Sequence, residues 1–133
     1  MHNSASFTLD LVMAECWTAG VKARIDAATI VKVFNEAALG QMMSFKVRLP
    51  ATYLRGDFEP RFSLALACKD LGLEIARATG TPMPLSALCE KEMIGQCPCW
   101  ADRDASIFLT LQEERAGIQV PLPPASVIAP DHR

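Results

Sequence analysis

The stretch FSLALACKDLGLEIA, residues 62–76, indicates what kind of fold this chain adopts. Its apolar side chains return every three or four residues, the spacing that places them on one face of a helix. This stripe consists of Leu64, Cys68, Leu71 and Ile75. A glycine after such a pattern is a common helix end, and Gly80 takes that place. We therefore expect a helix that ends at Gly80, and we expect it to be the longest of the chain.

Two charged residues, Lys69 and Asp70, stand side by side in the middle of this otherwise apolar helix. An amphipathic helix ordinarily turns such residues towards solvent, and composition alone favours that interpretation. The alternative is that the cation and the carboxylate face a cleft, where they would contact a ligand. The pattern of the helix itself leaves both interpretations open.

The segments before this helix also have helical spacing. Residues 41–48 are predicted to form a helix that Pro50 stops, because proline cannot donate the next hydrogen bond. A loop is predicted over residues 54–61, which contain the turn-forming residues Gly56, Asp57 and Pro60.

An earlier helix is predicted to begin after Asp26 and to end at Gly40. The carboxylate of Asp26 can accept hydrogen bonds from the free backbone N–H groups of a first turn, which makes it a suitable N-cap. The helical spacing of this segment comes from Ile30, Val33, Phe34, Ala37 and Ala38.

The N-terminal segment is expected to be a helix that is apolar on most sides and ends near Gly20. One predicted face contains Leu9, Val12, Met13 and Cys16. Further apolar side chains lie off that face, namely Phe7, Leu11 and Trp17. A helix of this kind is usually buried on most sides, so we expect it at the centre of the domain or in a subunit interface.

The C-terminal segments complete the predicted domain. Residues 81–84 form a proline-containing connector, and Pro84 suits the first turn of the next helix. The inner face of that helix is predicted to contain Leu85, Leu88, Cys89 and Met93. A last helix is predicted over residues 104–115, followed by Gly117, with its inward side chains being Ile107, Phe108 and Leu111.

Residues 1–118 are thus expected to form one all-α domain, without a convincing strand or an internal repeat. Residues 119–133 form a proline-rich tail that is expected to be extended or disordered. The length of 133 residues suits a single domain with a real core.

Composition argues against several classes of partner. The formal net charge is only −2, so bulk electrostatics draws the chain neither to nucleic acid nor to an anionic membrane. No apolar run approaches the roughly 20 residues that span a bilayer, and we see no targeting peptide. The five cysteines are an odd number and are scattered, so we expect a reduced, cytoplasmic protein.

The glycines of this sequence exclude a phosphate-cradling loop, because none of the seven lies near another. The pair Cys97 and Cys99 raises the question of a metal, but a structural zinc site needs four ligands. The other cysteines are isolated from one another, and the histidines stand at the chain ends. We therefore expect no metal site and interpret the pair as two loop thiols.

Residues 62–76 resemble the F-x-L-x-L-x-x-K-D-L-x-L-x-x-A segment of the 3-hydroxyisobutyrate dehydrogenase family, which is related to 6-phosphogluconate dehydrogenase. Residues 56–60 resemble the family's G-D-F-x-P loop, residues 80–85 its G-x-P-x-P-L connector and residues 104–106 its D-x-S pattern. His2 and Asn3 resemble the end of its K-x-x-N-N motif. The resemblance covers residues 2 to about 116.

This resemblance implies the helical C-terminal domain of an enzyme that uses NAD or NADP to oxidise a small hydroxyacid or to reduce an aldehyde acid. The cofactor would lie on a separate N-terminal Rossmann domain, and the helical domain would close the cleft and form much of a homodimer contact. Asn3 is then expected to bind the substrate through its amide. Lys69 is expected to reach the cofactor, and Phe62 and Asp70 are expected to line the pocket.

Two departures from the family pattern bear on activity. The general acid/base lysine would fall four residues before Asn3, ahead of Met1, so we expect the chain alone to be inactive and to bind no cofactor. Residues 96–101 replace a glycine-rich, acidic loop. The alternative function is a non-catalytic all-α interaction or oligomerisation module derived from the same family.

Overall fold

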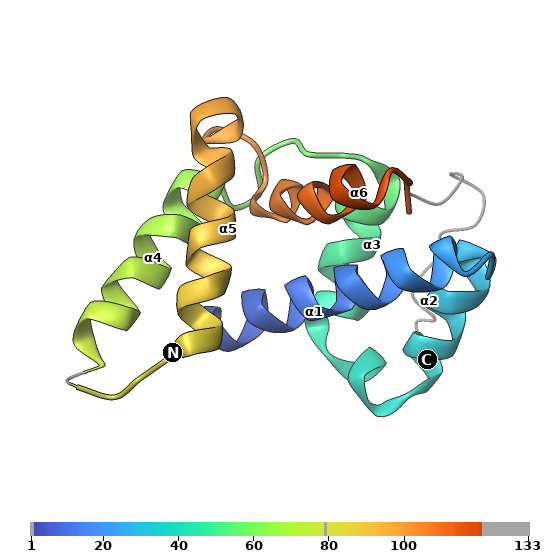
Figure 1. The fold of residues 1–133 in the computed structure, drawn as a ribbon, viewed down its shortest axis with the longest axis horizontal. Helices are drawn as coiled ribbons and strands as arrows, with labels where there is room; N and C mark the ends of the chain where they lie inside the picture. The colour runs from blue at the N-terminus through green and yellow to red at the C-terminus, as the bar shows by residue number, and fades with distance from the viewer. Residues whose placement is uncertain (1, 79, 121–133) are drawn as a thin grey trace.

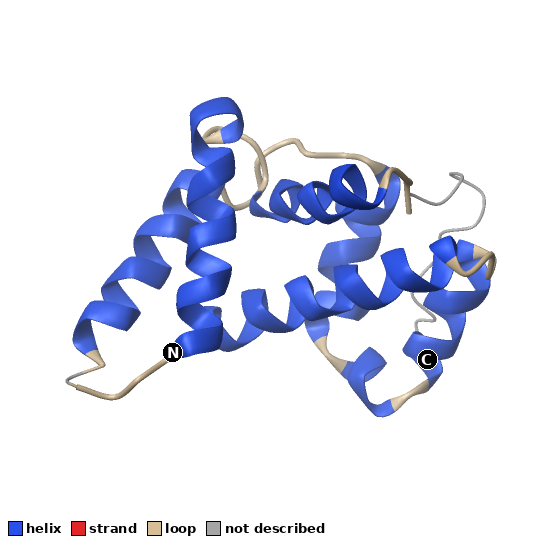
Figure 2. Ribbon diagram, in the orientation of Figure 1, coloured by secondary structure: helices blue, strands red, loops and turns tan. Residues whose placement is uncertain are grey.

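The computed structural model describes residues 2–78 and 80–120, without the side chains of residues 73–76. These residues form helices joined by short loops, and no strand occurs among them (Figures 1 and 2). The all-α fold expected from the sequence is therefore confirmed. The one β-type contact in this part of the chain is an isolated bridge between Ser63 and Asp104. The predicted tail lies outside the described residues from position 121 onward.

The elements follow one another in a simple order. The α-helices are α1 (His2–Lys22), α2 (Ala27–Glu36), α3 (Leu49–Ala51), α4 (Leu64–Arg77), α5 (Pro84–Trp100) and α6 (Thr110–Ala116). Between them lie the 3-10 helices η1 (Ala38–Gln41), η3 (Tyr53–Arg55) and η4 (Ala105–Leu109) and the π-helix η2 (Ser44–Arg48).

Helix α1 runs through the middle of the molecule and contacts α2, α4, α5, α6 and η4 (Figure 1). This confirms its expected central position, but the predicted face is half wrong. Met13 is buried and Leu9 is half-buried, whereas Val12 is 45% exposed and Cys16 is also exposed. Phe7 and Trp17, which were predicted to lie off that face, are buried. The prediction followed apolar spacing alone. The buried face instead includes polar positions whose partners lie on other elements, such as Asp10, which pairs with Arg48.

The segment around α2 begins as expected and ends earlier. The Asp26 carboxylate accepts hydrogen bonds from the backbone N–H and the hydroxyl of Thr29, at 2.9 and 3.1 Å. The predicted N-cap is therefore confirmed. The helix ends at Glu36 rather than near Gly40, and Val33 is 60% exposed although the spacing placed it inward.

The predicted stop at Pro50 is wrong. The π-helix η2 passes directly into α3, and Pro50 lies in the first turn of α3. The helical backbone therefore continues through Pro50 without the hydrogen bond that its missing N–H would make. Gly56 then ends η3 in the left-handed conformation, with φ 65°, as a glycine readily does.

Helices α4 and α5 pack against each other at one end of the molecule (Figure 1). Leu64 and Leu71 are buried as predicted, and the side chain of Ile75 lies outside the described residues. With 14 residues, α4 is shorter than both α1 and α5, so the expectation of the longest helix is wrong. Its predicted end at Gly80 also falls beyond Arg77.

Helix α5 differs from its predicted form at both ends. Cys89 and Met93 are buried, but Leu85 and Leu88 are 67% and 51% exposed, so the predicted inner face is half wrong. Residues 96–100, expected in a loop, are helical. Pro98 lies inside α5, two residues before its last residue, and cannot donate the helical hydrogen bond of its position.

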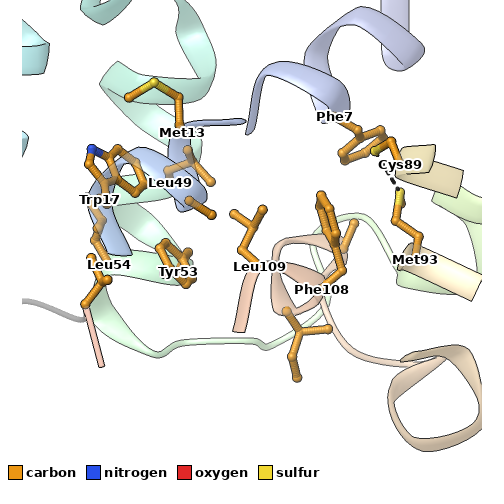
Figure 3. Packing of buried hydrophobic residues seen from close by; sticks show 14 of the residues in the cluster. Phe7, Met13, Trp17, Leu49, Tyr53, Leu54, Cys89, Met93, Phe108 and Leu109 are labelled. Carbon is orange, nitrogen blue, oxygen red and sulfur yellow. Dashed lines mark hydrogen bonds between the residues drawn. The ribbon is translucent and has the colours of Figure 1, made fainter. Parts of the chain in front are cut away.

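The core gathers around α1 (Figure 3). Trp17 stacks on Tyr53 at 6.0 Å and meets Phe45 edge-on, while Phe7 meets Phe108 edge-on at 6.3 Å. The last predicted helix divides into η4 and α6, and α6 ends at Gly117 with φ 66°. This core places the first turns of α1 against α4, where the candidate site lies.

Candidate functional site

Asn3 and Asp70, both expected at the substrate, are brought together by the packing of α1 against α4. The Nδ2 group of Asn3 donates a hydrogen bond of 3.1 Å to Oδ2 of Asp70, across 67 positions of sequence. Both side chains are half-buried. The contact restricts the rotamer of the Asn3 amide. A binding site is preorganised when its side chains are held in this way.

A pocket of about 330 Å³ lies beside this contact. It is lined by His2, Asn3, Ser6, Phe7, Met43, Ser44, Val47, Arg48 and Phe62. Phe62 stacks on Phe7 with ring centroids 6.2 Å apart, so the two rings form an apolar wall. Three of the four expected site residues therefore lie at or beside one pocket: Asn3, Phe62 and Asp70.

A charged pair missed by the sequence analysis stands next to this wall. Arg48, on η2, forms an ion pair with the fully buried Asp10 of α1 and donates a hydrogen bond of 3.3 Å to the Ser44 hydroxyl. Its guanidinium lies 5.4 Å from the centre of the Phe7 ring. Arg48 lines the pocket, and its second terminal nitrogen is buried without a hydrogen-bond partner among the described residues.

Burial raises the pKa of Asp10 above its usual value, although the charge and hydrogen bond of Arg48 and a hydrogen bond from Ser44 act in the opposite direction. Ser44 also shares a hydrogen bond of 3.1 Å with Ser6. The sequence did carry a signal for this group. An aspartate in the middle of an apolar helix is unusual. Like Lys69 and Asp70, Asp10 is therefore a charged residue that faces either solvent or a polar partner.

Lys69 lies apart from the other expected residues. It is exposed, does not line the pocket, and makes no hydrogen bond or ion pair with any described residue. Adjacent residues on a helix face different directions, so Lys69 and Asp70 do not serve the same surface. The exposure of Lys69 fits both interpretations of this pair, and Asp70 contacts Asn3 beside the pocket without lining it.

Other features of the described chain carry less chemistry. A larger, open hollow of about 730 Å³ lies between α6 and Gly56, but none of the expected residues lines it. Within residues 2–78 and 80–120, no group of three or more His, Cys, Asp or Glu side chains is arranged to hold a metal ion. In the same part of the chain, no helix has the length and apolarity that crossing a membrane requires.

Comparisons with known proteins agree with one another. Residues 2–109 match the family model for the NAD-binding of NADP-dependent 3-hydroxyisobutyrate dehydrogenase. The 2-(hydroxymethyl)glutarate dehydrogenase of Eubacterium barkeri is 25% identical over 111 residues, which are 81% of this chain and 36% of that protein.

The fold also resembles a solved structure of Mycobacterium tuberculosis 3-hydroxyisobutyrate dehydrogenase with L-serine. The TM-score is 0.72 at 24% identity, and the match covers 83% of this chain and 40% of that one. The chain therefore spans well under half the length of these relatives.

Proposed function

The chain belongs to the 3-hydroxyisobutyrate dehydrogenase family, and from this premise we propose that it supplies the helical, substrate-side half of a hydroxyacid dehydrogenase cleft. The observation that carries the proposal is the hydrogen bond between Asn3 and Asp70 beside a pocket that Phe62 and Arg48 line. The other half would be a Rossmann domain that holds NAD or NADP and provides the general acid/base lysine.

The pocket suits a small carboxylic acid. A volume of about 330 Å³ is at the low end for small-molecule sites, which run from about 300 to 1,000 Å³. The guanidinium of Arg48 offers a charge-assisted hydrogen bond to a carboxylate, and Asn3 would bind the hydroxyl group at the reacting carbon. The Phe7–Phe62 wall would exclude water from that carbon.

The described residues fit only one edge of a nicotinamide dinucleotide. The exposed ammonium of Lys69 complements an anionic cofactor, but no clustered glycines are present to cradle a pyrophosphate. When bound, NAD(P) would accept a hydride from the hydroxyacid carbon or donate one to an aldehyde. The role of this chain is therefore to orient the substrate and to cover the cofactor from one side.

The same proposal includes a homodimer. Leu85 and Leu88 expose most of their apolar surface on α5, and such surfaces tend to be buried on association. The non-catalytic module would use this surface as well, so the surface alone does not separate the two functions.

The dehydrogenase half and the non-catalytic module can be distinguished by the kinetics of an enzyme that joins this chain to a Rossmann domain of the family. Asn3→Ala is expected to lower kcat/KM by about ten- to a hundredfold, the effect of one lost substrate hydrogen bond. Arg48→Lys keeps a cation beside Asp10 but loses the fork geometry, so it is expected mainly to raise KM for the hydroxyacid. The control is Lys46→Ala, an exposed position on the same η2 turn. Unchanged kinetics in both site variants of an active joined enzyme would contradict the proposed site.

A further inference from the structure

Two thiols from different helices meet outside the candidate site. The Sγ atoms of Cys68 on α4 and Cys97 on α5 lie 3.1 Å apart, across 29 positions of sequence. A disulfide bond is about 2.05 Å long, so the two sulfurs need to approach by only about 1 Å to bond. The packing of α4 against α5 already holds both helices in place for this approach.

This pair differs from the other cysteines of the chain. Cys16 and Cys99 are exposed, and Cys89 is buried with its Sγ 3.9 Å from the Met93 sulfur (Figure 3). Cys68 and Cys97 are both half-buried, which leaves them reachable by a small oxidant. Among the described residues no third metal-binding side chain joins them.

The surroundings of Cys68 favour the thiol form of this residue. Burial, followed by the contact with Cys97, raises the pKa of the Cys68 thiol to about 12. Cys68 therefore stays mainly protonated near neutral pH and can donate its S–H to the Cys97 sulfur.

We propose that Cys68 and Cys97 form a reversible disulfide that joins α4 to α5. Hydrogen peroxide would oxidise one of the two thiols to a sulfenic acid and release one water. The other sulfur would then lose its proton and attack the oxidised sulfur, forming the S–S bond and breaking the S–O bond, with that proton leaving in a second water. A dithiol reductant returns both thiols by exchange.

The proposed disulfide would lie close to the candidate site, and its formation does not depend on the proposed function. Cys68 directly precedes Lys69 and lies two residues before Asp70 on α4. A disulfide would fix this part of α4 against α5. The chain would then carry an oxidation-sensitive link beside the residue that orients Asn3.

Mass spectrometry of the reduced chain treated with hydrogen peroxide tests the proposal. The intact mass is expected to fall by about 2 Da, the two thiol hydrogens, and to recover with a dithiol reductant. Trypsin is expected to release peptides 62–69 and 92–103 joined to each other, and the yield should not change on dilution of the protein. Because the second peptide also contains Cys99, the digest is repeated with Cys99→Ser, which is expected to give the same link.

Two serine variants complete the experiment. Cys68→Ser and Cys97→Ser are each expected to abolish the mass loss, whereas Cys16→Ser is expected to retain it, and far-UV circular dichroism checks that each variant folds. The proposal is overturned if folded Cys68→Ser loses the same mass as the wild type. It is equally overturned if wild type and Cys99→Ser only gain oxygen or form links between molecules.

Discussion

At the scale of single residues, the carboxyl group of Glu113 ties α6 to Tyr53, 60 positions away, and to Val120 just after the helix. Its Oε1 accepts hydrogen bonds from the Tyr53 hydroxyl at 2.7 Å and from the Val120 backbone N–H at 2.8 Å. Burial nevertheless raises the pKa of Glu113 above its ordinary value of 4.5, against the effect of both hydrogen bonds. The fold therefore favours the protonated form of this side chain.

The raised pKa of Glu113 determines how the stability of the fold depends on pH. A carboxyl group whose pKa is raised in the folded state contributes stability that is fully present below its unfolded pKa and is lost as the pH rises through its folded pKa. Glu113→Gln keeps the accepting oxygen and removes the charge. The free energy of unfolding of the wild type is therefore expected to fall relative to Glu113→Gln as the pH rises above 4.5.

Urea unfolding of both proteins at pH 4 and pH 8 measures this difference. As a matched control, Glu113→Ala leaves the Tyr53 hydroxyl without its partner and is expected to cost about 1–3 kcal/mol. A difference between wild type and Glu113→Gln that is the same at both pH values would contradict the assigned shift.

Lys69 and Leu71 give a second test at this scale. Lys69 is exposed and without a described partner, so Lys69→Ala is expected to change the stability of the chain by less than about 0.5 kcal/mol. Leu71 is fully buried, so Leu71→Ala is expected to cost roughly 2–5 kcal/mol. Urea unfolding compares the two variants, and equal destabilisation would mean that Lys69 has a structural role.

Single residues also show where sequence reasoning stops. The family motif identified Asn3, Phe62 and Asp70, and the fold gathers these three. Asp10 stands out in the sequence as an aspartate within an apolar helix, but its partner does not. The ion pair with Arg48 joins positions 38 apart on different elements, and no local pattern records such a pairing.

At the scale of elements, two glycines are expected to respond oppositely to substitution. Gly95 lies inside α5, and a Cβ added there meets nothing within 4 Å. Gly95→Ala is therefore expected to stabilise the chain by about 0.5–1 kcal/mol, because glycine loses more backbone entropy in a helix.

A Cβ added at Gly40 would instead overlap the Phe34 carbonyl oxygen and the backbone of Asn35. Gly40→Ala is expected to cost about 1–3 kcal/mol, since backbone atoms cannot move aside as a side chain can. Thermal unfolding should give a higher Tm for Gly95→Ala and a lower one for Gly40→Ala. A lower Tm for Gly95→Ala, or a higher Tm for Gly40→Ala, would contradict the packing described around these two glycines.

The existence of the helices was predictable, but their faces and ends were less so. Asp26 marks the start of α2 by a local hydrogen bond, which is why the sequence sufficed there. Pro50 was predicted to stop a helix, and residues 96–101 were predicted to form a loop. The structure is helical through both Pro50 and Pro98, so a proline alone does not fix where a helix ends.

At the scale of the whole molecule, the exposed apolar residues of α5 predict self-association. Light scattering is expected to report a dimer or larger species rather than the 14.5 kDa monomer. A variant with Leu85→Ser and Leu88→Ser is expected to shift the equilibrium towards monomer, because it removes apolar surface that association would bury. A wild-type monomer that persists across a wide concentration range would rule out this prediction.

We propose that these helices form one side of a dehydrogenase cleft and act only together with a nucleotide-binding side. The residues of the chain offer no glycine cluster for a pyrophosphate. In the proposal the general acid/base lysine belongs to the other half, and general acid/base catalysis alone contributes about 10²–10⁴-fold. The isolated chain is therefore expected to show no turnover of hydroxyacids or aldehyde acids with NAD(H) or NADP(H).

The most direct measurement is nicotinamide absorbance during incubation with a panel of small hydroxyacids. Three proteins are compared. The first is the isolated chain, and the second is the isolated Rossmann domain of a family member, cut so that it ends in the motif lysine. The third joins the two, with that lysine four residues before Asn3. We expect the joined protein alone to reduce the cofactor. Turnover by the purified isolated chain would contradict the proposed function, as would a folded joined protein that binds the cofactor but oxidises no acid of the panel.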